Sequence, residues 1–195
     1  MTKIGIILGS TRPGRRGQAV AEWVAAVAAK QDGDATYELV DLADFDLPVL
    51  DEEHPALFGK YGKEHTTRWA EAIGSYDGFV FVTAEYNHSV PGALKNGLDY
   101  LFAEWNNKAA GFVSYGLHGG TRAVEHLRLI LAEMKVATVR SQVVLSLFND
   151  FKFSDPTETG TFVPGPHQEP TLVTMLSEVV SWSQALKPLR DPALV

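Results

Sequence analysis

The sequence predicts an α/β protein of three layers, in which helices cover both faces of a doubly wound, five-stranded parallel sheet. Along the 195 residues, strand-like and helix-like segments alternate five times, which is typical of repeated βα units. Three of the strand-like segments are apolar throughout, as expected for strands buried on both faces. The other two alternate apolar and polar residues, which is typical of edge strands.

The predicted strands fix the expected order of the sheet. The continuously apolar segments are KIGIILG (3–9), DGFVFVTA (77–84) and AAGFVSYG (109–116). The alternating segments are TYELVDL (36–42) and ATVRSQVVLS (137–146). Placing the second and fifth strands at the edges gives the order 2-1-3-4-5, which is the flavodoxin-like order. The alternative order 3-2-1-4-5 fits less well, because it places the alternating second strand inside the sheet.

Helical periodicity predicts five helices between and after these strands. In the first helix, Val20, Trp23, Val24 and Val27 share one face. The predicted helices span residues 18–30, 63–76, 91–102, 122–135 and 171–186. The stretch 44–62 remains as a long connection that we expect over a ligand or against a partner subunit. The stretch 149–170 is expected to be a loop.

Composition excludes several classes of function. The formal net charge of −7 argues against nucleic-acid and anionic-membrane binding, because no basic stripe is present. The lack of cysteine excludes disulfides, thiolate zinc sites and a cysteine nucleophile, and it fits a cytoplasmic protein. Neither a signal peptide nor a membrane-spanning segment is expected. We expect residues 1–195 to form a single domain.

A small basic loop, LGSTRPGRRG, follows the first predicted strand and precedes the first helix. Backbone N–H groups at a helix N-terminus attract anions, and arginines can bind phosphate oxygens with two hydrogen bonds. The loop has neither the GxGxxG pattern nor the GK[ST] ending of a nucleotide-binding loop. It therefore predicts a cradle for a single terminal phosphate. The alternative is an ordinary solvated basic loop.

Two further loops, 84–91 and 115–121, are expected at the same edge of the sheet as the loop 9–18. In the first, Tyr86 can lie against a flat ring and Asn87 can meet ring oxygens and nitrogens. In the second, the glycines Gly116, Gly119 and Gly120 permit close approach of the backbone to a planar ligand. Each loop alone could be an ordinary βα turn. Together, the three loops favour a planar, monophosphorylated cofactor, and FMN fits that description.

Three motifs carry a resemblance to a known family: GSTRPGRRGQAVAEWV, EYNHSVPGALKNGLDYL and SYGLHGGTRAVEHLR. They resemble the NAD(P)H-dependent FMN reductase family of flavodoxin-like quinone, azo and chromate reductases, and the likeness runs from Lys3 to Leu147. The resemblance implies an oxidoreductase with FMN as cofactor and NADPH or NADH as co-substrate. It implies a second acceptor, such as a quinone, an azo compound, a metal oxyanion or free flavin, and ping-pong kinetics.

The resemblance also implies which residues bind the cofactor. The FMN phosphate is expected at Ser10, Arg12, Arg15, Gly17, Gln18 and Ala19. The isoalloxazine is expected at Glu85, Tyr86 and Asn87, with Ser114, Tyr115 and Gly116 closing on its edge. The chain departs from many relatives at Ala84, where they have proline, and at Arg15 and Gly17, where they have serine or asparagine. No side-chain acid or base is obligatory for hydride transfer, so no catalytic residue is assigned.

Several histidines, two further arginines and Glu85 could take other roles in the predicted site. His88 and His118 lie in the predicted cofactor loops, where a solvent-facing histidine is commoner than one with a redox role. No metal site is predicted, because the other histidines, His54, His65, His126 and His167, show no metal-ligand spacing. Arg16 and Arg122 are candidates for reading the 2′-phosphate of NADPH. Glu85 could serve as a general base, but no nucleophile partner for a hydrolase is evident.

Alternatives from other classes remain open. A flavodoxin-type electron carrier would bind FMN without reacting with NAD(P)H, and a redox-sensing module would bind a partner according to flavin state. The three-arginine loop and the lack of an aromatic pair around EYN favour the reductase. Apolar residues on more than one face of the helices from Pro91 and Thr171 predict a homodimer or homotetramer.

Overall fold

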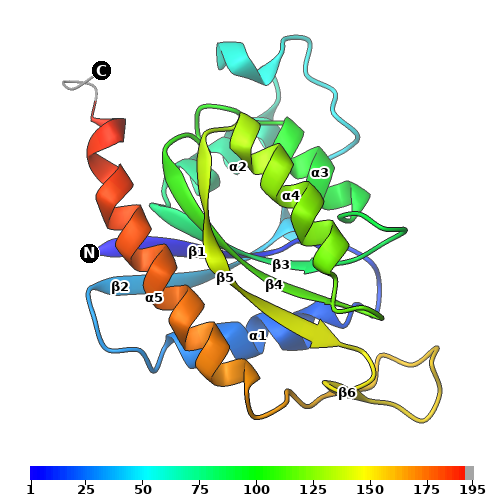
Figure 1. Ribbon diagram of the computed structural model, residues 1–195. Coiled ribbons are helices and arrows are strands. Elements are labelled where there is room, and N and C mark those ends of the chain that lie inside the picture. Colours follow the sequence, from blue (N-terminus) through cyan, green and yellow to red (C-terminus); the bar gives the residue numbers. More distant parts are fainter. Residues whose placement is uncertain (192–195) are drawn as a thin grey trace.

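The computed structural model describes residues 1–191, and its central sheet has the strand order that the sequence predicts (Figure 1). All neighbouring strands of this five-stranded sheet, β2-β1-β3-β4-β5, pair in parallel. Its strands are β1 (Thr2–Leu8), β2 (Ala35–Asp41), β3 (Gly78–Ala84), β4 (Lys108–Gly116) and β5 (Val136–Ser146). The helices are α1 (Gly17–Ala28), α2 (Glu64–Gly74), α3 (Gly92–Asp99), α4 (Thr121–Glu133) and α5 (Gln168–Leu186).

Helices cover both faces of the sheet, as a doubly wound fold requires. Helices α1 and α5 lie on one face, and α2, α3 and α4 lie on the other (Figure 1). Val24, Val82 and Leu176 belong to the core on the α1 side. Trp69 and Trp105 belong to the core on the other side, where aromatic rings meet edge to face. The two faces of the sheet therefore each bury a separate apolar layer.

The burial of the strands confirms the expected edges. Strands β3 and β4 are buried at every position, and β1 is buried at all but one. Strand β2 has a single buried residue, Val40, and β5 mixes buried with accessible residues along its length. Because an edge strand has one unpaired side and less helical cover, its outward residues tolerate polar side chains.

All five predicted helices lie close to the observed ones, and the largest differences, of three residues, occur at one end of α3 and of α5. Helix α3 ends at Asp99, although the apolar periodicity continues to Phe102. Tyr100 and Leu101 remain buried beyond its end, so burial rather than helical geometry explains the pattern. Helix α5 begins at Gln168, earlier than the predicted Thr171. Pro170 lies in its first turn, where the missing N–H group costs no hydrogen bond.

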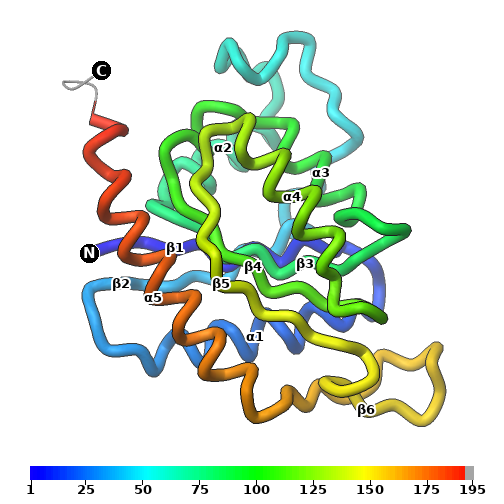
Figure 2. Tube along the Cα trace, viewed as in Figure 1, coloured from blue at the N-terminus to red at the C-terminus, as the bar shows by residue number. Residues whose placement is uncertain are grey.

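The two long connections also contain structure that the sequence did not predict. The stretch expected to be a loop, 149–170, holds a small antiparallel pair, β6 (Phe151–Lys152) and β7 (Thr161–Phe162). Strands of two residues are too short to produce a hydrophobic period. The stretch 44–62 overlaps the 3-10 helix Leu42–Phe45 and contains Ala56–Phe58. In Figure 2 its trace stands out from the body as a cyan arm. No helix within residues 1–191 is both long and apolar enough to cross a membrane.

Candidate cofactor site

The three loops singled out in the sequence meet at the carboxyl edge of the sheet. They follow β1, β3 and β4, and strand order reverses between β1 and its neighbour β3. The Ser10 hydroxyl of the first loop lies 2.8 Å from the Tyr86 hydroxyl of the second. The Arg122 N–H, after the third loop, donates to Glu85 of the second at 3.2 Å. The loops are therefore in direct contact at the place where open α/β sheets bind ligands.

The first loop leads into an uncapped helix. Within the described chain, no side chain caps the N-terminus of α1, and its first turn has no acidic residue. Gly17 permits a close approach, because a Cβ atom there would lie 2.4 Å from the Tyr115 hydroxyl. A pocket of about 560 Å³ lies beside this helix end. It is lined by Thr11, Arg12, Pro13, Gly14, Arg15, Gln18, Ala19, Glu22 and Thr159. This arrangement suits a phosphate group.

The three arginines of the loop have different surroundings. Arg15 forms an ion pair with Asp41, at the end of β2, and donates to the Ser10 carbonyl at 2.8 Å. Arg16 donates to backbone carbonyls of residues 156–159. Arg12 is exposed, and its guanidinium makes no hydrogen bond or ion pair within residues 1–191. Arg12 is thus the arginine that is free to bind an anion in the pocket.

Tyr115 provides a second free group at the same place. Its side chain is 5 % exposed, and its hydroxyl makes no hydrogen bond of good geometry within the described residues, although the Ser10 side chain lies near it. Burial raises the pKa of Tyr115 more than the Ser10 side chain lowers it, so the hydroxyl keeps its proton and can donate a hydrogen bond to a ligand. An unpaired buried hydroxyl costs free energy, which a bound acceptor would recover. The residues present therefore fit a phosphorylated cofactor.

The second loop is a tight turn. Tyr86 and Ser89 pair through two backbone hydrogen bonds, and Asn87 and His88 between them have φ of 49° and 74°. Two residues with positive φ are typical of a type I′ turn. The turn exposes 36 % of Tyr86. A cleft of about 80 Å³ separates the first two loops and is lined by Arg12, Arg16, Ala84, Glu85, Tyr86, Tyr115, Gly116 and Leu147.

Glu85 supports the third loop with its carboxylate. One oxygen accepts hydrogen bonds from the N–H groups of Arg122 and Ala123, at 3.2 and 3.4 Å, and the other forms an ion pair with the Arg122 side chain. The carboxylate therefore caps the N-terminus of α4, and its side chain is only 6 % exposed. This arrangement gives no support to the general-base hypothesis, because the carboxylate is already paired.

Ser114 lies within the sheet rather than at its edge. Its side chain is buried, and its hydroxyl donates to the Gly119 carbonyl at 2.7 Å. The Gly116 carbonyl accepts hydrogen bonds from the N–H groups of Gly119 and Leu147. Ser114 thus stabilises the third loop through its hydrogen bond to Gly119, whereas Tyr115 and Gly116 line the cleft.

Sequence reasoning missed two residues that shape the pocket beside the N-terminus of α1. Asp41 holds Arg15, and Thr159 lines the pocket from the stretch between β6 and β7. The sequence offered a signal for Asp41, because this residue lies at the end of a predicted strand whose carboxyl end lies at the same edge of the sheet as the basic loop. Thr159 had none, since it is 142 or more positions from the basic loop and lies in a segment without periodicity.

The histidines of the loops contact protein groups. His88 Nδ1 lies 3.3 Å from Arg122 Nη1, and His126 Nδ1 lies 3.0 Å from Ser89 Oγ. His118 is exposed. No group of three or more histidine, aspartate or glutamate side chains within residues 1–191 could hold a metal ion.

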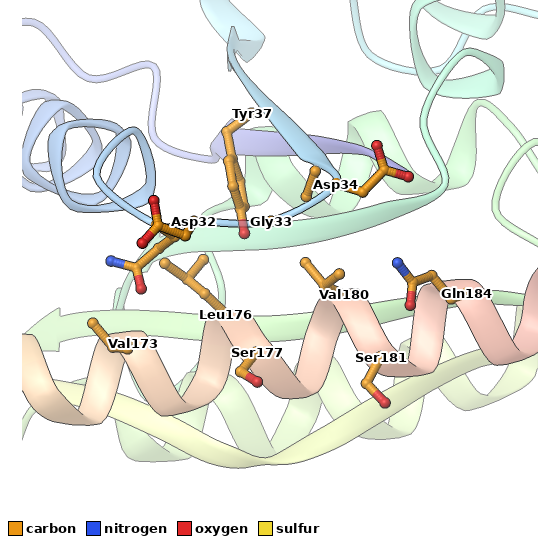
Figure 3. A pocket seen from close by; sticks show the side chains of 12 residues that line it. Asp32, Gly33, Asp34, Tyr37, Val173, Leu176, Ser177, Val180, Ser181 and Gln184 are labelled. Atoms are coloured by element: carbon orange, nitrogen blue, oxygen red, sulfur yellow. The ribbon is translucent and has the colours of Figure 1, made fainter. Parts of the chain in front are cut away.

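Another pocket, of about 400 Å³, lies at the opposite end of the sheet (Figure 3). The turn before β2, including Asp32, Gly33 and Asp34, faces Val180 and Gln184 of α5 across it. It lies at the amino ends of the strands, away from the loops described above. We therefore do not include it in the cofactor site.

Comparison with known proteins identifies the family. Residues 2–150 match the family described as NADPH-dependent FMN reductase. An NAD(P)H-dependent FMN reductase of a Nectria species is 43 % identical over 149 residues, which cover 72 % of this chain and 74 % of the relative. The chain belongs to the NADPH-dependent FMN reductase family. A quinone reductase of Escherichia coli is 37 % identical over 133 residues, covering 64 % of this chain and 66 % of that protein.

A solved structure supports the fold of this FMN reductase. The flavoenzyme NAD(P)H:(acceptor) oxidoreductase FerB from Paracoccus denitrificans matches with a TM-score of 0.70 at 19 % identity, covering 95 % of this chain and 98 % of that one. Family membership confirms the prediction of an oxidoreductase with FMN as cofactor and NAD(P)H as co-substrate. The individual binding residues remain predictions.

Proposed function

We propose that this FMN reductase holds the cofactor phosphate at Arg12 and the N-terminus of α1, and that it passes electrons to a small oxidised acceptor. The observation that carries the assignment is the Arg12 guanidinium, which is unpaired at the pocket while Arg15 and Arg16 are engaged. Quinones, azo compounds, metal oxyanions and free flavin are the candidate acceptors. The quinone reductase relative supports the first of these.

The residues of the first loop have complementary roles in holding the phosphate. Arg12 supplies the positive charge, and the N–H groups of Gly17, Gln18 and Ala19 supply donors at the positive end of the α1 dipole. Tyr115, beside Gly17, supplies a neutral hydroxyl that can donate a hydrogen bond to the phosphate. Arg15 keeps the loop in shape through Ser10 and Asp41 and does not bind the phosphate itself.

The second and third loops position the ring system. Tyr86 presents a partly exposed aromatic face, and Gly116 lines the same cleft without a side chain. Asn87 lies at the tip of the turn, where its amide can meet polar atoms of the ring. Bound FMN would supply the redox chemistry, namely acceptance of a hydride from NAD(P)H and transfer of two electrons to the acceptor. The protein orients the two rings and excludes water, and no side chain needs to move a proton.

We also propose that the protein is a homodimer or homotetramer that associates through the arm, residues 44–62. Val49, Leu50, Leu57 and Phe58 on this arm are between 45 % and 87 % exposed. Exposed apolar side chains gathered on one segment are typical of an association surface. Asn96 of α3 anchors the arm by donating to the Pro48 carbonyl at 2.6 Å and accepting from the Leu50 N–H at 3.0 Å.

The test of the proposed function is a visible spectrum of the FMN-loaded protein without oxygen, before and after one equivalent of NADPH or of NADH. We expect rapid bleaching of the flavin band by at least one nucleotide and recovery of the band on addition of a quinone. Tight FMN binding without bleaching would instead indicate an electron carrier. Absence of FMN binding would contradict the phosphate assignment.

A further inference from the structure

One contact at the pocket has no role in the proposed function. Arg16, directly before α1, lines the adjoining cleft and uses its guanidinium to bind a loop that is distant in the sequence. That loop, residues 153–160, connects β6 to β7, and we call it the strap. The Arg16 guanidinium donates to the Thr159 carbonyl at 2.8 Å, to the Pro156 carbonyl at 3.2 Å and to the Glu158 carbonyl. Three backbone carbonyls therefore converge on a single side chain.

The strap also donates a hydrogen bond to the basic loop. The Thr159 hydroxyl donates to the Gly14 carbonyl of the basic loop at 3.0 Å. The ring of Phe153, at the start of the strap, lies under the Arg16 guanidinium at 5.1 Å. The basic loop therefore donates hydrogen bonds to the strap, and the strap donates one to the basic loop. Together these bonds hold the two segments against each other.

The strap is anchored at its base and ordered within its turn. Phe151 packs on Tyr115, and Phe162 packs on Trp23 of α1, so β6 and β7 are tied to the core. At the tip, Asp155 accepts hydrogen bonds from the N–H and hydroxyl of Thr157 at 2.7 and 2.6 Å. The strap side chains from residue 154 onward are exposed. Within the described part of the chain, the hydrogen bonds that join the strap to another segment are those with the basic loop.

The strap forms part of the phosphate pocket. Thr159 lines that pocket together with Arg12, Gly14 and Gln18. Gly14, which accepts the Thr159 hydroxyl, lies between Arg12 and the start of α1 and has a positive φ of 66°. Movement of the strap would therefore move both a wall of the pocket and the backbone of the basic loop.

We propose that the strap retains FMN by holding the basic loop closed around its terminal phosphate, with Arg16 and Thr159 as positioning residues. This inference rests on the proposed position of the phosphate. It assigns Arg16 to cofactor retention rather than to recognition of the 2′-phosphate of NADPH. Since riboflavin lacks the phosphate but shares the ring system, the strap should affect FMN and leave riboflavin binding unchanged.

The experiment compares dissociation of FMN and of riboflavin from the full-length chain by recovery of flavin fluorescence. The variants are Arg16→Met, which keeps the aliphatic stem, and Thr159→Val, which keeps the shape. Arg68→Met is a matched control, because Arg68 donates to the carbonyls of Asp44 and Phe45 and stacks on the Phe45 ring. A flavin-free readout is cleavage of the apoprotein by a glutamate-specific protease at Glu158.

We expect Arg16→Met to speed FMN release about tenfold or more and Thr159→Val about threefold, which correspond to charged and neutral hydrogen bonds. Riboflavin binding should not change, cleavage at Glu158 should rise in Arg16→Met, and Arg68→Met should behave as the parent protein. Equal effects on both flavins, or unchanged FMN release, would overturn the inference. Faster release in Arg16→Met alone, without added cleavage, would instead indicate direct contact with phosphate. If the parent protein fails to bind FMN, the proposed function fails as well.

Discussion

Arg15 is paired with Asp41, a residue at the end of the neighbouring strand β2. The two side chains are only 13 % and 19 % exposed, and Arg15 also donates to the Ser10 carbonyl. The pair therefore fixes the path of the basic loop from inside. Within residues 1–191, the Arg15 guanidinium is already paired, whereas that of Arg12 is not.

This pairing separates the effects of two arginine substitutions. Arg12→Ala should weaken FMN binding by about 1.5–3 kcal/mol, or roughly 10- to 150-fold, because one charged hydrogen-bond donor is lost. The apoprotein should keep its stability, since Arg12 is exposed and unpaired. Fluorescence titration with FMN and thermal unfolding of the apoprotein measure the two quantities.

Arg15→Ala serves as the comparison. It leaves Asp41 partly buried without its partner, and we expect the free energy of unfolding to fall by about 1–3 kcal/mol. A stable Arg15→Ala protein that no longer binds FMN would show that Arg15 contacts the phosphate directly. An unchanged dissociation constant in Arg12→Ala would remove Arg12 from the site.

Tyr86→Ala should change turnover and the choice of acceptor more than it changes folding. The ring is partly exposed at the cleft, so little apolar area is lost from the core. We expect a loss of about 1 kcal/mol in stability, since the buried Ser10 hydroxyl loses the Tyr86 hydroxyl at 2.8 Å and, within the described residues, keeps only the long hydrogen bond from the Arg12 N–H. Steady-state kinetics with two quinones of different size measure turnover and acceptor choice, and a urea titration measures the free energy of unfolding. Tyr86→Phe removes only the hydroxyl and should preserve acceptor choice, whereas normal kinetics with collapsed stability in Tyr86→Ala would indicate a packing residue.

Glu85→Gln should lower stability by about 1–2 kcal/mol, because the N-terminus of α4 and Arg122 lose a negative charge. The pH profile of flavin reduction should keep its shape, since the carboxylate is not a proton donor or acceptor in the reaction. Stopped-flow reduction between pH 5 and pH 9 tests this point. A variant of normal stability whose reduction has become independent of pH would restore the general-base hypothesis.

We expect Lys108 to make the free energy of unfolding depend on pH on the alkaline side. Its side chain is 3 % exposed, and burial lowers its pKa to about 7 from 10.5. The ammonium group donates to the carbonyls of Ile73 and Gly74 at the end of α2, and Arg190, Asp77 and Glu104 also act on its charge. Between pH 7 and pH 10.5 the unfolded chain holds the proton that the folded chain has lost.

The contribution of Lys108 to the free energy of unfolding should therefore rise with pH between pH 7 and pH 10.5, by at most about 1.4 kcal/mol per pH unit. Lys108→Met should lack this contribution, so the difference in unfolding free energy between parent and variant should change with pH. Urea unfolding at pH 7, 8, 9 and 10 measures it. A constant difference at all four values would show that Lys108 keeps its charge in the folded protein.

The arm, residues 44–62, is predicted to mediate association between copies of the chain. Phe58→Ser should shift the protein toward monomer, because a side chain that is 65 % exposed would lose its apolar contact with another copy. Light scattering coupled to size exclusion gives the mass of each species. Leu189→Ser, at an exposed apolar position on another segment, should leave the mass unchanged. A parent protein that is already monomeric would contradict the proposal.

Much of the fold could be predicted because hydrophobic periodicity reports burial directly. Apolar continuity in KIGIILG and GFVFVTA follows from burial on both faces, and alternation in TYELVDL follows from an edge position. The end of α3 was predicted less well, because Tyr100 and Leu101 are buried without being helical. The β6–β7 pair could not be predicted, since two-residue strands have no period.

The sequence by itself determined that this chain is a parallel α/β protein with a basic loop and two further loops at one sheet edge, and its motifs were sufficient to indicate the FMN reductase family. Only the tertiary structure decided which arginine is free. Arg12, Arg15 and Arg16 are near neighbours of the same type, so local sequence cannot separate them. Asp41 lies 26 positions from Arg15, and Thr159 lies 143 from Arg16. Their pairing depends on chain segments that only folding brings together, because hydrogen bonds and ion pairs act over a few ångströms of space and not along the sequence.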